Sequence, residues 1–271
     1  MKIKSIIGLS VMAVAFLTAF TWMNDDATKE PVKDEYKVIK VNGKIVMSKS
    51  GKNLSTGDIF EPETKLKFVT PQSRAAVISK VKGRFVLKPD NNKSGTNLLP
   101  AMNNIASRSG AILNLIDLKN HFKDNYLIID QVKVSVGQDA FPMDDNNFFY
   151  LQYQHDGETI RKKLDAEDNH LIIDKSELFK IDGNPIEPKN EETMALYYRK
   201  SAEKTSTKIN TFTPVFPNLD ELKVEVQVII DEYSGKDNDK IKDEVTAYLN
   251  EFYGKPNKEN LESWLKKEFD I

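Results

Sequence analysis

Short apolar runs separated by turn residues follow one another from residue 37 to residue 90 of the 271-residue chain. The Asn42-Gly43 pair stands between two alternating runs, which is the strongest short-range signal of a β-hairpin. Lys82-Gly83 marks a further turn before a strand that ends near Pro89. Strands that recur about every ten residues are typical of a small sandwich or barrel. The pattern therefore predicts a first β-module over residues 37–90.

A connector at 91–121 leads to a second β-rich region over residues 122–213. In the connector, apolar positions between Ile112 and Phe122 fit a helical face, although Ser109-Gly110 interrupts it upstream. In the second region, Asp156-Gly157 and Asp182-Gly183 each predict a hairpin. No helix of useful length separates the predicted strands, so we expect a second sandwich or barrel rather than a parallel α/β sheet.

The apolar residues of the C-terminal segment, residues 214–271, change to helical spacing. Asn218, with Glu221 three residues later, forms a capping-box signature at the start of a helix. Apolar residues also alternate over 224–230, which fits a strand, and the caps make helix the preferred interpretation. A second helix is predicted over 241–252, because apolar residues recur at helical spacing and Gly254 follows.

Four large apolar residues lie on one face of a short helix predicted at the C-terminus: Leu261, Trp264, Leu265 and Phe269. Such a helix is marginal alone in water, so its stability must come from packing. One interpretation is that the face docks within the chain and clamps the second β-module. The other is an exposed, Trp-bearing anchor that binds a partner. We favour docking, because most such faces are buried locally.

The first 23 residues have the pattern of an export signal. Lys2 and Lys4 precede an apolar run that continues to Met23 and ends at Asn24. A positive start followed by such a run is typical of a secretory signal peptide, and its length also fits an uncleaved membrane anchor. Both interpretations place the chain from Asp25 onward outside the cytoplasm. The polar residues 24–36 are expected to form a tether.

The composition excludes several functional classes. The chain has 39 basic and 41 acidic residues, so it lacks the basic surplus that nucleic-acid binding requires. It contains no cysteine, which excludes disulfides, thiolate metal sites and cysteine nucleophiles. With 39% hydrophobic and 30% charged residues, the chain is too polar for a multispan membrane protein.

Four segments of the first β-module, residues 41–45, 54–59, 65–77 and 82–89, follow one pattern. The pattern is a strand with a glycine turn, then L-x-x-G-D, then S-x-A-x-V, then a second glycine turn into a strand. In this pattern the module resembles the periplasmic domain of FecR-type proteins. The resemblance implies a β-fold in an extracytoplasmic setting. FecR regulators also carry a cytoplasmic segment that handles a sigma factor. We expect only Met1 to Lys4 on the cytoplasmic side here, so the regulatory activity is not carried over.

The sequence contains no signature of a catalytic site. Its three histidines, His121, His155 and His170, lack the spacing of a zinc-binding helix. A nucleophile elbow and the glycine-rich phosphate-binding motifs are also missing. The acidic residues Asp237 and Asp239 resemble the start of a calcium loop, but the residues that follow do not fit one, so we expect them to cap a helix.

One aromatic strand is a candidate binding face. Phe148, Tyr150 and Gln152 point to one side of this strand, and the residues between them point to the other. A strand that is apolar on both sides usually lies in the centre of a sandwich. The functional alternative is a face that binds glycan or peptide.

Together these patterns predict an exported α+β protein, mainly β. A signal peptide or anchor precedes two successive small β-sandwich or barrel modules and a C-terminal helical segment. We expect a non-catalytic bacterial envelope protein, periplasmic or held in the inner membrane, that binds protein subunits of a secretion or signalling assembly. The alternative is a binding module for cell-wall glycan or peptide. We assign no catalytic, cofactor or metal residue and no nucleic-acid partner, and we expect membrane contact only through the N-terminal segment. The candidate partner-binding residues are Leu261, Trp264, Leu265 and Phe269.

Overall fold

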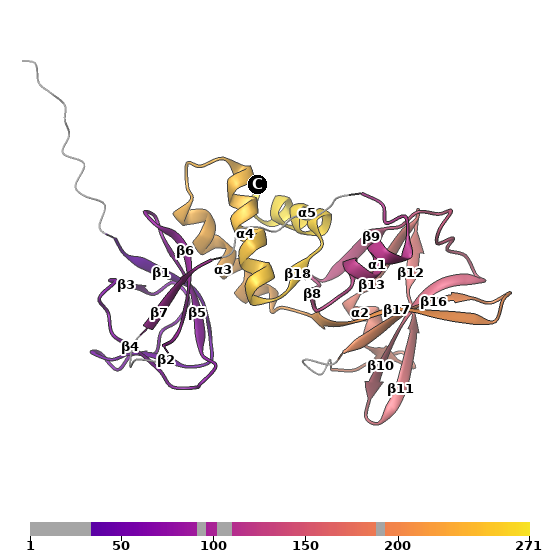
Figure 1. The fold of residues 1–271 in the computed structure, drawn as a ribbon, viewed down its shortest axis with the longest axis horizontal. Coiled ribbons are helices and arrows are strands. Elements are labelled where there is room, and N and C mark those ends of the chain that lie inside the picture. Colours follow the sequence, from indigo (N-terminus) through magenta and orange to yellow (C-terminus); the bar gives the residue numbers. More distant parts are fainter. Residues whose placement is uncertain (1–33, 91–95, 102–109, 188–192) are drawn as a thin grey trace, which may run out of the picture. The chain divides into compact units, whose positions relative to one another are not determined.

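The computed structural model describes residues 34–90, 96–101, 110–187 and 193–271. Their fold is α+β and mainly β, with several sheets and a C-terminal helical segment, as predicted (Figure 1). The signal or anchor predicted at 1–23 and most of the tether at 24–36 lie outside the described residues. Within those residues, no helix is long and apolar enough to cross a membrane.

The first β-module contains an antiparallel sheet with the strand order β3-β1-β5-β6-β7. Its strands are β1 (Tyr36–Asn42), β3 (Ile59–Phe60), β5 (Arg74–Ser79), β6 (Gly83–Pro89) and β7 (Thr96–Pro100). A ribbon of β2 (Ile45–Met47) and β4 (Leu66–Phe68) shares a hydrophobic cluster with one side of this sheet, through residues such as Ile45 and Val77. Because neighbouring residues of a strand point to opposite sides, Ile39 and Ile78 lie in a different cluster. The sheet is therefore buried on both sides.

The hairpin predicted at Asn42-Gly43 is wrong. β1 pairs with β3 and β5, whereas β2 pairs with β4, so the chain leaves the sheet at this turn. Gly43 has a φ of +79°, and a Cβ at this position would lie 2.6 Å from the Ser73 Oγ. The Ser73 hydroxyl accepts a hydrogen bond from the Lys44 N–H and donates one to the Lys44 carbonyl. This contact fixes the turn, and β1 and β2 pair with strands that are distant in sequence rather than with each other.

The first module extends beyond its predicted end at residue 90. β7, within the predicted connector, pairs with β6. The connector also contains α1 (Leu115–His121), whose N-cap Asn114 accepts a hydrogen bond from the Asp117 N–H. Leu118 is the buried residue of this helix, whereas Ile116 is 70% exposed. The helical face is therefore narrower than the sequence pattern predicts.

The second β-module consists of two sheets that share one hydrophobic cluster. One sheet has the order β11-β10-β16-β17-β8-β18 and the other β12-β13-β9. The strands of the first sheet are β8 (Asn125–Leu127), β10 (Asn147–His155), β11 (Glu158–Lys163), β16 (Met194–Lys200), β17 (Thr205–Val215) and β18 (Lys255–Pro256). The strands of the other sheet are β9 (Gln131–Ser135), β12 (Asp165–Glu167) and β13 (His170–Asp174). Leu151 and Ile173 represent the two sheets in the shared cluster, as expected for a sandwich.

The turns of the second module agree with the sequence pattern, but one strand does not. The hairpins at Asp156-Gly157 and Asp182-Gly183 are confirmed, the second between β14 (Lys180–Ile181) and β15 (Asn184–Pro185), which follow the short α2 (Lys175–Leu178). β17 was not predicted, because its first residues are polar and exposed, and buried apolar side chains begin only at Ile209.

Three helices form the C-terminal segment: α3 (Leu219–Glu232), α4 (Asn238–Phe252) and α5 (Lys258–Phe269). The Asn218 side chain accepts hydrogen bonds from the N–H groups of Asp220 and Glu221, so the helix interpretation is confirmed and the strand alternative is wrong. Asp237 caps α4 as predicted.

The three helices share a hydrophobic cluster with the first sheet and with one edge of the second module. This cluster combines Val226 and Val245 of the helices with Ile39 and Ala76 of the first sheet. The prediction that the helices clamp the second module therefore left out the first sheet, against which they also pack. The C-terminal segment also contacts the second module: Leu127 and Ile129 belong to the same cluster, and β18 pairs with β8. The Asn260 side chain adds polar contacts, because it bonds both the N–H and the carbonyl of Lys133 on β9.

Candidate functional site

The four residues predicted as a partner-binding face are used within the chain. Leu261, Trp264 and Leu265 are 2%, 9% and 0% exposed and belong to the cluster that the helices share with the first sheet. Phe269 is half-buried and packs edge-on against Trp264, with ring centroids 5.4 Å apart. Leu261, Trp264 and Leu265 are therefore buried within the chain, as the docking interpretation expects, rather than exposed as an anchor.

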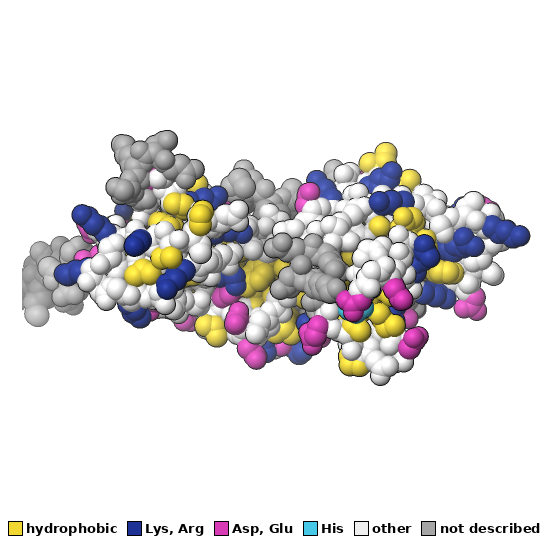
Figure 2. Space-filling view, turned by 90° about the horizontal axis from the view of Figure 1, so that it is seen from below, with side chains coloured by type: hydrophobic (Ala, Val, Ile, Leu, Met, Phe, Trp, Pro, Cys, Tyr) yellow, Lys and Arg dark blue, Asp and Glu magenta, His cyan; other side chains and the backbone are white. Residues whose placement is uncertain are grey.

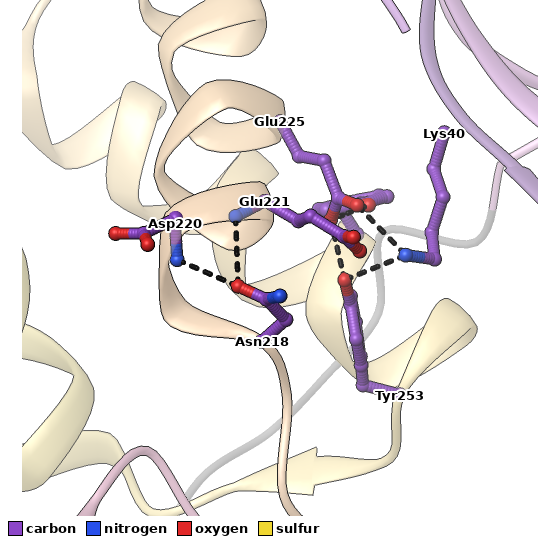
Figure 3. A network of polar contacts seen from close by, with 7 residues as sticks. Lys40, Asn218, Asp220, Glu221, Glu225 and Tyr253 are labelled. Carbon is purple, nitrogen blue, oxygen red and sulfur yellow. Dashed lines mark hydrogen bonds and ion pairs between the residues drawn. The ribbon is translucent and has the colours of Figure 1, made fainter. Parts of the chain in front are cut away.

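A buried polar network lies where α3 and α4 meet the first sheet (Figure 3). Lys40 on β1 places its Nζ 2.7 Å from the Glu225 Oε1 and donates a hydrogen bond of 2.8 Å to the Tyr253 hydroxyl. The hydroxyls of Tyr248 and Tyr253 donate to the Glu225 Oε2 at 2.7 and 2.6 Å. Burial, reinforced by the Glu225 carboxylate, raises the pKa of both tyrosines, so they remain neutral donors.

A second ionic contact joins the first sheet to α4. The Arg84 side chain on β6 is fully buried, with its Nη1 2.6 Å from Glu251 and its Nε 3.6 Å from Glu244 on α4. The first module and the C-terminal segment also carry opposite net charges. Residues 34–90 include 12 basic and 6 acidic residues, whereas residues 214–271 include 8 basic and 14 acidic residues. Since Glu225 is only 3% exposed, these groups stabilise the junction and are not placed to bind a ligand.

The three histidines do not come together. The His121 Nε2 lies 2.7 Å from the Tyr126 hydroxyl, and burial, with a smaller effect from Lys255, lowers the pKa of His121 to about 3. His155 lies beside Asp156 in the β10–β11 hairpin, and His170 begins β13. In the described ranges, no group of three or more His, Cys, Asp or Glu residues is placed to hold a metal ion.

The feature that remains is one side of the sheet β11-β10-β16-β17, which we call the basic–aromatic face. Cross-strand pairing aligns its residues in rows: Lys163, Tyr150, Tyr197 and Lys208 form the central row. Gln152 pairs with Arg161 on one side of this row, and Phe148, Arg199 and Ser206 are aligned on the other. Phe149, Leu151 and Tyr153, which alternate with these residues on β10, point into the core.

The side chains of the basic–aromatic face contact one another. The rings of Tyr150 and Tyr197 are stacked, with centroids 5.0 Å apart and an interplanar angle of 5°. The Lys163 Nζ lies over the Phe148 ring at 4.8 Å, and the Arg161 Nε donates a hydrogen bond of 2.9 Å to the Gln152 Oε1. A shallow hollow of about 510 Å³ is lined by Phe148, Tyr150, Arg161, Lys163, Arg199 and Ser206.

Basic side chains are segregated on this face. Residues 122–213 contain 17 acidic and 12 basic residues, so the second module has an acidic surplus. Nevertheless, the paired strand positions of the basic–aromatic face, all of them described, include Arg161, Lys163, Arg199 and Lys208 and no carboxylate. Figure 2 shows Lys and Arg side chains gathered at the right-hand end, where the β16–β17 hairpin lies in Figure 1. The composition of the module does not account for this arrangement.

Sequence reasoning identified only part of this face. Phe148, Tyr150 and Gln152 were predicted from the alternation along one strand. Arg161 and Lys163 were not predicted as part of the face, although the register of the predicted Asp156-Gly157 hairpin places Lys163 opposite Tyr150. The residues on β16 were missed, because the pairing of β16 with β10 spans more than forty residues of sequence. Those on β17, which pairs with β16, were missed because β17 itself was not recognised.

Comparisons with known proteins do not assign the chain to a family. No protein-family model matches it, and no curated protein matches it. Among solved structures, it is similar to the N-terminal four Ig domains of Dscam1 isoform 6.44, with 11% sequence identity and a TM-score of 0.19. The alignment covers 67% of this chain and 45% of the Dscam1 chain, less than half of that structure. A TM-score this low does not establish a common fold.

Proposed function

We propose that the protein is a non-catalytic, exported component of a bacterial cell-envelope assembly and that it binds a partner subunit through the basic–aromatic face. The observation that carries the proposal is the segregation of Arg161, Lys163, Arg199 and Lys208 around half-exposed aromatic rings in a module with an acidic surplus. Interfaces are enriched in aromatic residues and arginine, and complementary charge guides partners together. A rigid sheet presents such side chains without a large loss of conformational entropy.

Export is part of the same proposal. Its support is the sequence pattern of Lys2 and Lys4 before the apolar run that ends at Asn24. The resemblance of the first module to FecR-type periplasmic domains is also part of the proposal. The glycines of that pattern lie at turns: Gly57, with a φ of +84°, precedes β3, and Gly83 lies between the antiparallel strands β5 and β6.

Two measurements on the native host test the proposal. Fractionation and intact mass should find the protein outside the cytoplasm, shortened by about two dozen residues or retained in the inner membrane. Crosslinking followed by size-exclusion chromatography should recover a stoichiometric complex with another envelope protein. Full-length soluble protein in the cytoplasm, or an exported protein with no protein complex, would contradict the proposal.

A second candidate function is binding of cell-wall glycan or peptide. The observation that favours it is the presence of Phe148, Tyr150 and Tyr197 on an accessible sheet face, since aromatic rings are common in such sites. Retention of the protein on purified peptidoglycan, without a protein partner, would select this candidate.

A further inference from the structure

We propose that the ligand of the basic–aromatic face is an acidic segment of a polypeptide, with at least one apolar or aromatic side chain between its carboxylates. This inference rests on the proposed function, because it specifies the chemistry of the partner. It assigns binding roles to Arg161, Lys163, Arg199 and Lys208 at the periphery and to Phe148, Tyr150 and Tyr197 in the centre.

The spacing of the basic groups fits an extended chain. Lys163 and Lys208 occupy the two ends of the central row, three strand spacings or about 14 Å apart. An extended polypeptide covers this distance with about four residues. Acidic residues a few positions apart therefore reach both ends of the row, while the residues between them pass over Tyr150 and Tyr197.

The charge of the face selects an anionic ligand. Arg161 and Lys163 belong to β11, and Arg199 and Lys208 belong to β16 and β17, so positive charge borders the aromatic rings on both sides. Among the described residues, Asp145 forms an ion pair with Lys163 at 4.0 Å, and the Asp145 side chain is fully exposed. A partner carboxylate can replace this weak contact, since exposed pairs contribute little to stability.

The aromatic rings distinguish a peptide from a glycan. A sugar ring stacks through its C–H groups on an open aromatic face, but Tyr150 and Tyr197 cover one face of each other. One face of Phe148 carries the Lys163 ammonium. Ring edges are electropositive and the tyrosine hydroxyls are hydrogen-bond donors, so these groups suit carboxylates and the edges of apolar side chains better than a flat saccharide.

Binding of synthetic probes to the full chain tests the inference. The first probe is a fluorescent peptide of about twelve residues in which Glu alternates with Phe and Ser, long enough to cross the sheet. The second is the same peptide with Gln in place of Glu, and the third is oligogalacturonate, a carboxylated glycan. We expect the Glu peptide to bind about tenfold or more tightly than the Gln peptide, and its affinity to fall as salt rises from about 50 to about 300 mM.

Charge-reversal variants locate the site. Arg161→Glu/Lys208→Glu changes two exposed side chains of the face and should weaken Glu-peptide binding by about tenfold or more. The matched control is Lys119→Glu/Lys266→Glu, which changes two exposed lysines on α1 and α5 and should leave binding unchanged. Thermal melts of both variants should match the wild type, because none of these side chains is buried.

Three results would overturn the inference: no preference for Glu over Gln, equal loss in both double variants, or tighter binding of oligogalacturonate than of the Glu peptide. The last would select the glycan instead. These failures are distinct from failure of the proposed function. If the native envelope complex survives Arg161→Glu/Lys208→Glu, the assignment of this face is wrong, whereas the protein remains a component of the assembly.

Discussion

Lys40 and Glu225 form an ion pair of 2.7 Å between the first strand of the chain and the first C-terminal helix, across 185 positions of sequence. Both side chains are largely buried, with 16% and 4% of their surface exposed. Two tyrosine hydroxyls satisfy the second carboxylate oxygen, so the charge of Glu225 is fully compensated. The pair joins the first sheet to α3 and so helps to specify how the C-terminal helices pack against this sheet.

We expect Lys40→Met to lower the free energy of unfolding by about 3 kcal/mol, because it leaves the Glu225 carboxylate buried without its cation. Lys40→Met/Glu225→Leu should recover a large part of the loss, since both charges are then absent. Urea unfolding measures each value. Lys44→Met changes an exposed lysine near the same strand and serves as control. If Lys40→Met is as stable as Lys44→Met, the pair does not stabilise the junction.

Local signals in the sequence predicted the individual elements well. Asn218 and Asp237 cap α3 and α4, and Asp156-Gly157 forms its hairpin, because caps and tight turns depend on residues a few positions apart. The pairing of β1 with β5 was not predictable in this way. Asn42-Gly43 has the chemistry of a hairpin turn, but contacts with the distant Ser73 decide where the chain goes.

The candidate site was predicted only along the strand that carries it. Alternation separates Phe148 and Tyr150 from the core-facing residues, and this depends on the strand alone. Tyr197 and Arg199 join them through the register between β10 and β16, which the sequence pattern does not contain. For the same reason, the amphipathic pattern of Leu261 and Trp264 predicted a buried face but not the distant residues with which that face forms a cluster.

Gly57 should tolerate Asn better than Val. It has a φ of +84°, and no atom lies within 4 Å of a Cβ built at this position, so the cost of substitution is conformational rather than steric. We expect Gly57→Val to lower the free energy of unfolding by more than about 1 kcal/mol, and Gly57→Asn by less, because Asn adopts the left-handed region more readily. Thermal melts that do not distinguish Gly57→Val from wild type would rule out this turn.

Trp264 should be essential for stability rather than for binding. Its side chain is 9% exposed in the cluster shared by the helices and the first sheet, so Trp264→Ala should cost about 3 kcal/mol or more. Glu262→Ala, on the exposed side of the same helix, removes a surface pair with Lys258 and should cost less than about 0.5 kcal/mol. Truncation after Gly254 should likewise lower the melting temperature. Unchanged melting of the truncated chain would mean that α5 does not dock.

His121 should make the fold less stable in mild acid. Burial lowers the pKa of His121 from 6.5 to about 3 in the folded chain, where its Nε2 lies 2.7 Å from the Tyr126 hydroxyl. Between these two pKa values the unfolded chain binds more protons than the folded chain, so the free energy of unfolding decreases as the pH falls. The stabilisation is fully present above the unfolded pKa. At about pH 5 the free energy of unfolding is lower by about 2 kcal/mol.

Urea unfolding of wild type, His121→Gln and His170→Gln from about pH 8 to about pH 4 isolates this effect. Gln cannot titrate, so His121→Gln should have a shallower pH dependence of the free energy of unfolding, even if it is less stable throughout. His170→Gln is the matched control, because it removes a half-buried histidine at the start of β13 and leaves His121 in place. It should therefore keep the wild-type slope. Equal slopes for wild type and His121→Gln would show that His121 is not held neutral by burial, because a buried neutral imidazole must be protonated when the chain unfolds in acid.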